Sequence, residues 1–173
     1  HNEPNTVLEG LGSSWSDGST FSAWWRALLK EYRLALPEVR FIYPGLSPGA
    51  SVIGVKQDHI QFLEASRAAA EEADGLGVHL YWSAYQPMAQ ALAELDDIIS
   101  RFRSRPLWIT EASYNQGEAQ AGQIAKDYLR FWRELQTRPV VRGVTYFVAS
   151  ASDPKIANQV WVGRSIGRLV GRR

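Results

Sequence analysis

Two glutamates stand apart from the other acidic residues because their contexts suit acid–base chemistry. Glu3 lies in the segment His1-Asn2-Glu3-Pro4-Asn5, and Glu111 directly follows the apolar run 107–110. A carboxylic acid can protonate a leaving oxygen, and a carboxylate can attack an electrophilic carbon or activate water. The structural alternative for Glu111 is a strand-end carboxylate paired with an arginine. The two residues are therefore candidates for proton transfer and nucleophilic attack.

The position of Glu111 at the end of a strand makes it the more informative of the two. Strand alternation predicts that Leu107, Ile109 and Glu111 share one face of the strand, with Trp108 and Thr110 on the other. A carboxylate on an otherwise apolar face is costly unless it has a partner or a function.

The elements that must position these glutamates alternate along the chain. Amphipathic stretches that predict helices lie at 19–36, 57–74, 86–103, 118–136 and 164–169. Short apolar runs that predict strands buried on both faces lie at 39–43, 78–82, 107–110 and 143–148. Strands alternating with helices favour βαβ units and a parallel sheet. We expect an α/β fold in a single domain over residues 1–173.

The spacing of the strand ends is compatible with two architectures. Steps of 39, 28 and 38 residues separate Tyr43, Trp82, Thr110 and Val148. A (β/α)8 barrel averages roughly 30 residues per unit, and a doubly wound sheet can be similar. No glycine-rich nucleotide-binding motif follows a strand. If Glu3 and Glu111 both end barrel strands, they lie on one catalytic face, as cleavage of a glycosidic bond requires.

The motifs Asn2-Glu3-Pro4 and Trp108-Ile109-Thr110-Glu111 resemble those of the clan A glycoside hydrolases, which are retaining enzymes on a (β/α)8 TIM barrel. The resemblance implies that Glu3 is the general acid/base at the end of strand four. It implies that Glu111 is the nucleophile at the end of strand seven. It further implies that residues 1–173 hold only about the second half of the barrel, from the tip of strand four through strand eight. No cofactor is implied.

The same resemblance assigns contacts with a carbohydrate substrate. Asn2 should contact the sugar hydroxyl next to the anomeric carbon. His79 and Tyr81 share one strand face, and the resemblance places the tyrosine against the nucleophile. The structural alternative for this pair is two buried strand residues with satisfied polar atoms.

Three tryptophans are candidate platforms for stacking sugars. Trp15 and Trp161 lie in loops expected on the catalytic face, and Trp82 ends a strand. Packing in the core is the alternative for each. Many clan members carry a tryptophan facing the sugar on strand eight, where this chain has Tyr146-Phe147.

Composition excludes several classes of function. Lys and Arg total 19 against 18 Asp and Glu, so the net charge of +1 argues against nucleic acid or an anionic membrane as partner. No apolar run approaches the ~20 residues of a membrane span. The chain has no cysteine, which excludes disulfides and cysteine-bound zinc. His79 alone predicts no metal site.

The expected half-barrel leaves several functional interpretations open. A full barrel takes ~250 residues, so three earlier strands would precede His1 in a longer enzyme. This incomplete chain would then be inactive alone, or would pair with the missing half or a second copy. The leading expectation is a retaining O-glycoside hydrolase. The alternatives are a non-catalytic carbohydrate-binding or assembly module and a barrel enzyme for phosphorylated substrates. The residues do not indicate a localisation, and secretion is implied by the resemblance alone.

Overall fold

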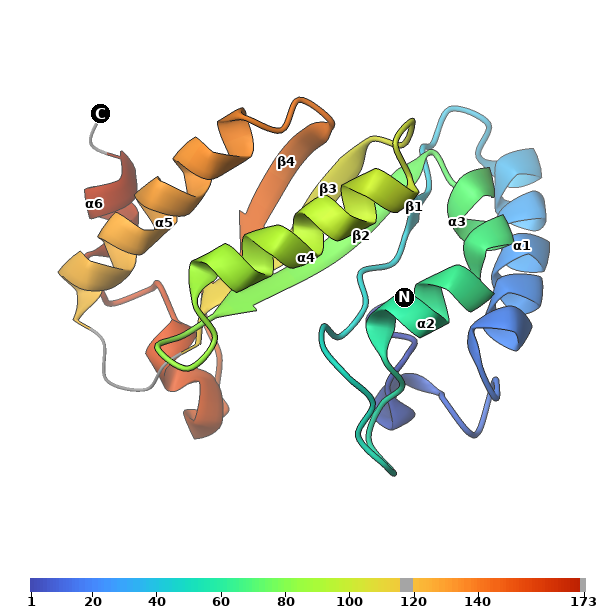
Figure 1. The fold of residues 1–173 in the computed structure, drawn as a ribbon, viewed down its shortest axis with the longest axis horizontal. Coiled ribbons are helices and arrows are strands. Elements are labelled where there is room, and N and C mark those ends of the chain that lie inside the picture. The colour runs from blue at the N-terminus through green and yellow to red at the C-terminus, as the bar shows by residue number, and fades with distance from the viewer. Residues whose placement is uncertain (116–119, 172–173) are drawn as a thin grey trace.

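A four-stranded parallel sheet forms the centre of the computed structural model, which describes residues 1–115 and 120–171. Consecutive strands are neighbours in the sheet, in the order β1-β2-β3-β4 (Figure 1). The strands are β1 (Ile42–Tyr43), β2 (Gly75–Trp82), β3 (Leu107–Tyr114) and β4 (Val141–Tyr146). The α/β class and the parallel βαβ connections predicted from the sequence are confirmed.

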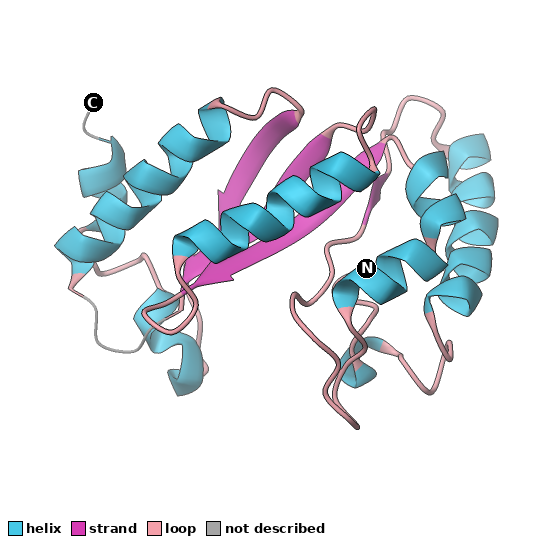
Figure 2. Ribbon diagram, viewed as in Figure 1, coloured by secondary structure: helices cyan, strands magenta, loops and turns pink. Residues whose placement is uncertain are grey.

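Helices connect the strands and cover the sheet, as Figure 2 shows. The α-helices are α1 (Gly18–Ala35), α2 (His59–Ala65), α3 (Arg67–Glu72), α4 (Met88–Arg101), α5 (Ala121–Gln136) and α6 (Ile166–Gly171). Two 3-10 helices, η1 (Val7–Glu9) and η2 (Pro154–Gln159), lie in loops. No helix of the described residues is both long and apolar enough to cross a membrane.

The two faces of β2 have different roles. Leu76, Val78, Leu80 and Trp82 are each at most 4 % exposed, and they belong to the core between the sheet and helices such as α4, which crosses the sheet in Figure 1. The alternate residues, among them His79 and Tyr81, face the opposite side. This second face carries the candidate site.

The helix expected over 57–74 is divided in two at Ser66. The Ser66 hydroxyl lies 2.8 Å from the carbonyl oxygen of Phe62 and also contacts the hydroxyl of Tyr43. A serine that bonds to backbone carbonyls of the preceding turn competes with the regular helix. The expectation of one continuous helix is therefore wrong here.

Other boundaries shift by a few residues. Helix α1 begins at Gly18, one residue earlier than expected, because Asp17 caps it in a capping box with Thr20. Strand β2 begins at Gly75, which leaves room for the ring of Trp108, since a Cβ there would lie 2.1 Å from that ring. The expected start of the fourth helix at Glu118 lies outside the described residues.

Candidate active site

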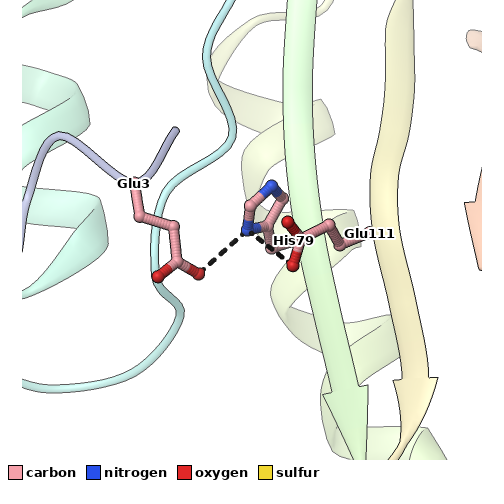
Figure 3. A group of neighbouring side chains, drawn as sticks. All are labelled: Glu3, His79 and Glu111. Atoms are coloured by element: carbon pink, nitrogen blue, oxygen red, sulfur yellow. Dashed lines mark hydrogen bonds and ion pairs between the residues drawn. The ribbon is translucent and has the colours of Figure 1, made fainter. Parts of the chain in front are cut away.

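Glu3 enters the site from the loop at the start of the chain, and its carboxylate points toward His79 (Figure 3). Its backbone has a φ of +38°, a left-handed conformation that few residues other than glycine adopt. The amide N–H of Glu3 donates to the Gly45 carbonyl at 3.0 Å, and the amide of Thr6 donates to the Glu3 carbonyl at 2.9 Å. These bonds hold the strained residue so that its carboxylate points toward β2 and β3.

Glu111 reaches the same side of the sheet because of a β-bulge. His79 pairs with Glu111 and Val78 pairs with Ile109, so Thr110 is an extra residue on β3. Such an insertion changes the phase of alternation and redirects the following side chain. Ile109 is therefore buried at 1 % exposure, whereas the side chain of Glu111 is 20 % exposed and faces the site. The expectation that Glu111 shares a face with Ile109 is wrong.

His79 lies between the two carboxylates, as Figure 3 shows. Its Nδ1 is 3.0 Å from Oε1 of Glu3 and 3.6 Å from Oε2 of Glu111. The imidazole is only 2 % exposed, while the carboxylates are about one-fifth exposed. The structure thus brings together three of the residues singled out in the sequence, from a loop and two strands.

Tyr81 completes this cluster from β2. Its hydroxyl donates a hydrogen bond to Oε2 of Glu111. Burial, together with the bonded carboxylate, raises the pKa of the Tyr81 phenol well above its ordinary value, so the phenol stays protonated and remains a donor. Glu111 is therefore partnered by a tyrosine and a histidine rather than by the arginine of the structural alternative.

Two of the three expected tryptophan platforms, Trp15 and Trp82, are buried in the core. Trp82 is 2 % exposed and stacks on Phe131 of α5 at 4.7 Å, on the helix-covered face of the sheet. Trp15 is 6 % exposed, and its indole N–H donates to the Pro4 carbonyl. Trp161 stacks on Tyr146 at 5.4 Å. Core packing, the alternative considered for each, describes Trp15 and Trp82 better than contact with a sugar.

Asn2 is exposed and adjoins Glu3 in the chain.

One aromatic residue that sequence reasoning missed does lie near the site. The ring of Phe147, just beyond β4, is 6.3 Å from the ring of Tyr81 in an edge-on arrangement. Its position after the last strand, where the resembling family carries a tryptophan, is the signal that could have identified it.

Ligand atoms of Glu3, His79 and Glu111 all lie within 4.8 Å of one another, so this cluster could offer three donors to a cation. The prediction of no metal site assumed that His79 had no acidic neighbours, and that assumption is wrong.

Comparisons with known proteins identify a family for the chain. The model of the family described as "Glycosyl hydrolase catalytic core" matches residues 1–165. A comparison with curated proteins gave no match.

Solved structures share the fold of the chain. A GH128 (subgroup II) endo-β-1,3-glucanase from Sorangium cellulosum has a TM-score of 0.73 at 16 % identity, over 98 % of this chain and 66 % of that one. A subgroup I endo-β-1,3-glucanase from Amycolatopsis mediterranei in complex with laminaritriose has a TM-score of 0.66 at 21 % identity, over 98 % and 68 %. A subgroup VI exo-β-1,3-glucanase from Aureobasidium namibiae has a TM-score of 0.67 at 14 % identity, over 96 % and 60 %.

The chain thus spans about two thirds of the length of these structural relatives. At such identities the likeness establishes a common fold, and the family match covers nearly the whole chain. The chain therefore belongs to the glycosyl hydrolase catalytic core family.

Proposed function

We propose that this chain carries the catalytic pair of a retaining glycoside hydrolase, with Glu111 as nucleophile and Glu3 as general acid/base. The observation that carries the proposal is that one carboxylate oxygen of Glu3, one of Glu111 and a ring nitrogen of His79 all lie within 4.8 Å of one another. Retaining enzymes hold their carboxyl groups about 5–5.5 Å apart, and inverting enzymes about 6.5–9.5 Å. Two carboxylate oxygens that approach this closely leave less room for a water between them than an inverting site has, which favours a double displacement.

In the first step, an oxygen of Glu111 bonds to the anomeric carbon as the glycosidic C–O bond breaks. The proton of Glu3 moves to the departing oxygen, and a glycosyl ester of Glu111 remains. In the second step, the Glu3 carboxylate takes a proton from water while the water oxygen bonds to the anomeric carbon. The ester bond breaks, and both glutamates return to their starting states.

Tyr81 and His79 are proposed to prepare the two glutamates. The hydrogen bond that the Tyr81 hydroxyl donates to Oε2 fixes the orientation of the Glu111 carboxylate, so that its other oxygen can attack. His79 is buried and touches both carboxylates, so it can hold them in one orientation. Asn2, next to Glu3, is proposed to contact the hydroxyl beside the anomeric carbon.

We propose a β-1,3-linked glucan as the substrate class. The support is that structural relatives with the same fold are named as β-1,3-glucanases, and one of them holds laminaritriose. The residues of this chain also favour a carbohydrate, since the paired carboxylates suit an acetal bond.

The chain is further proposed to be a partial (β/α)8 barrel of the clan A type, forming one domain over residues 1–173. Among the described residues, β1 and β4 each pair with a single neighbour, so the sheet has two open edges. Helix α1 also leaves Trp24, Leu28 and Tyr32 between 37 % and 47 % exposed along one side. A preceding half-barrel would cover these surfaces, and a second copy of the chain is the alternative partner.

The test uses the full-length polypeptide that carries these residues, with laminarin as substrate. Retention predicts that the β-anomer of the product appears first by proton NMR. Glu111→Gln should abolish turnover yet keep binding of laminaripentaose. Glu38→Gln is the matched control, because Glu38 is exposed in the loop before β1, at the opposite end of the strands. It should leave turnover unchanged.

Other outcomes separate the alternatives. First appearance of the α-anomer would indicate inversion and contradict the double displacement. Binding of laminaripentaose without any hydrolysis by the unaltered protein would instead favour the non-catalytic carbohydrate-binding module.

A further inference from the structure

Asn5 connects the segment that bears Glu3 to a different part of the chain. Its side chain is fully buried. Its amide nitrogen donates to the carbonyls of Ser47 and Gln57, each at 2.9 Å, and its amide oxygen accepts from the Ser47 N–H at 2.9 Å. One side chain thus satisfies three backbone groups of the loop between β1 and α2.

The same loop touches the catalytic cluster directly at Gly45. The Gly45 carbonyl accepts the amide N–H of Glu3 at 3.0 Å. A Cβ on Gly45 would lie 2.3 Å from Cδ2 of His79 and 2.8 Å from Oγ1 of Thr110, so the loop backbone packs against the imidazole. The backbone of the loop therefore bonds to the backbone of Glu3 and packs against the ring of His79.

We infer that Asn5 is a positioning residue for the proton-donating carboxyl of Glu3. The inference rests on the proposed function. Glu3 lies in a loop, and its left-handed backbone must be held by its surroundings. Asn5, two residues away, supplies side-chain bonds that fix this loop against the Gly45 segment. Glu111 lies on β3 and is held by the ladder between β2 and β3, and none of the side-chain hydrogen bonds of Asn5 reaches that strand.

This difference predicts which step Asn5 affects. A general acid must lie within hydrogen-bond reach of the leaving oxygen, and a displacement of about 1 Å can cost about 100-fold in rate. Loss of Asn5 should therefore slow cleavage where the leaving group needs a proton. It should spare cleavage where the leaving group departs unprotonated, because the nucleophile stays in place.

The experiment compares kcat/KM of the full-length polypeptide on two substrates. Laminaripentaose has a sugar leaving group that needs a proton from the general acid. The dinitrophenolate released from 2,4-dinitrophenyl β-laminaribioside leaves without one. Asn5→Ala should lower kcat/KM about 10- to 100-fold on the first and by less than about threefold on the second. If Asn5→Ala does not fold, Asn5→Ser is measured instead, because its hydroxyl is small and can still bond to one of the three backbone groups.

Ser66→Ala is the matched control for general destabilisation. Ser66 is also a fully buried polar residue, with hydrogen bonds on the helix-covered side of the sheet. It should lower Tm without changing the ratio of the two kcat/KM values. Equal losses on both substrates for the Asn5 variant, or no loss on either, would overturn the inference.

Glu3→Gln separates this inference from the function on which it rests. Like Asn5→Ala, it should lower kcat/KM more on laminaripentaose than on the dinitrophenyl substrate, and the difference between the two losses should be larger. If Glu3→Gln shows that dependence and Asn5→Ala does not, the positioning role alone fails. If Glu3→Gln lacks it, the assignment of Glu3 as general acid fails, and the role of Asn5 fails with it.

Discussion

Tyr81 and Glu111 face each other from neighbouring strands, and the phenol hydroxyl donates to Oε2 of the carboxylate. The contact depends on the bulge at Thr110, because regular alternation would turn Glu111 toward the helices with Ile109. An irregularity of the sheet therefore creates the pairing between the proposed nucleophile and its hydrogen-bond donor.

Tyr81→Phe should lower kcat/KM on laminaripentaose about 10- to 100-fold, because a hydrogen bond to a charged group is worth roughly 1.5–3 kcal/mol. The ring and its packing remain, so Tm should change little. Tyr85→Phe makes the same change on a side chain that is 92 % exposed, and it should leave kcat/KM unaltered. Equal rates for Tyr81→Phe and the unaltered enzyme would contradict a role for the phenol.

Azide should distinguish the roles of the two glutamates. With 2,4-dinitrophenyl β-laminaribioside, Glu3→Ala should form the glycosyl ester but hydrolyse it slowly, because water lacks a general base. Azide needs no base, so it should raise kcat about 10-fold or more and yield the β-glycosyl azide. Glu111→Ala should instead yield the α-glycosyl azide by direct displacement. If Glu3→Ala gave the α-azide and Glu111→Ala the β-azide, Glu3 would be the nucleophile and Glu111 the general acid/base.

The sequence predicts the strands and their parallel pairing well because local patterns carry that information, whereas the same patterns left the strand order open between two architectures. Continuous apolar runs near β2 and β3 and amphipathic stretches between them lead directly to parallel βα units. The break at Ser66 was not predictable in this way. It depends on a contact with Tyr43, which lies 23 residues away in the chain.

The site was predictable in its residue types but less so in its geometry. Glu3, His79, Tyr81 and Glu111 were all singled out from motif and alternation, and all four lie together. The bulge that redirects Glu111 has no local sequence signal. For Trp82 the sequence left a sugar platform and core packing open, because a strand end can face either side and its neighbour Phe131 comes from a distant helix.

Trp82 should matter for stability rather than for sugar binding. Trp82→Ala removes a buried ring that stacks on Phe131, and large-to-small changes of this kind cost about 3–5 kcal/mol. Urea unfolding should show this loss, while KM for laminaripentaose should stay within about twofold for the folded fraction. Phe131→Ala, which removes the other ring of the stack, should behave alike. A large rise in KM without a loss of stability would indicate a sugar platform after all.

Asp74 should make part of the free energy of unfolding depend on pH. It accepts the Phe41 N–H at 2.8 Å and lies 3.4 Å from Nη2 of Arg33, and these contacts hold the pKa of its carboxyl below the usual value. A lowered folded pKa means that the carboxylate stabilises the fold above its unfolded pKa of about 3.9. That contribution is lost as the pH falls through the lower folded pKa.

Asp74→Asn should therefore reduce the free energy of unfolding by about 1 kcal/mol at pH 7, because a partly exposed charged hydrogen bond is weakened by solvent. The difference from the unaltered protein should shrink as the pH falls below about 4 and vanish once Asp74 is protonated in the folded state. Urea unfolding between neutral and strongly acidic pH measures this difference, with Glu38→Gln as the control that removes an exposed carboxylate. A difference that stays constant with pH would mean that Asp74 acts through its shape and not through its charge.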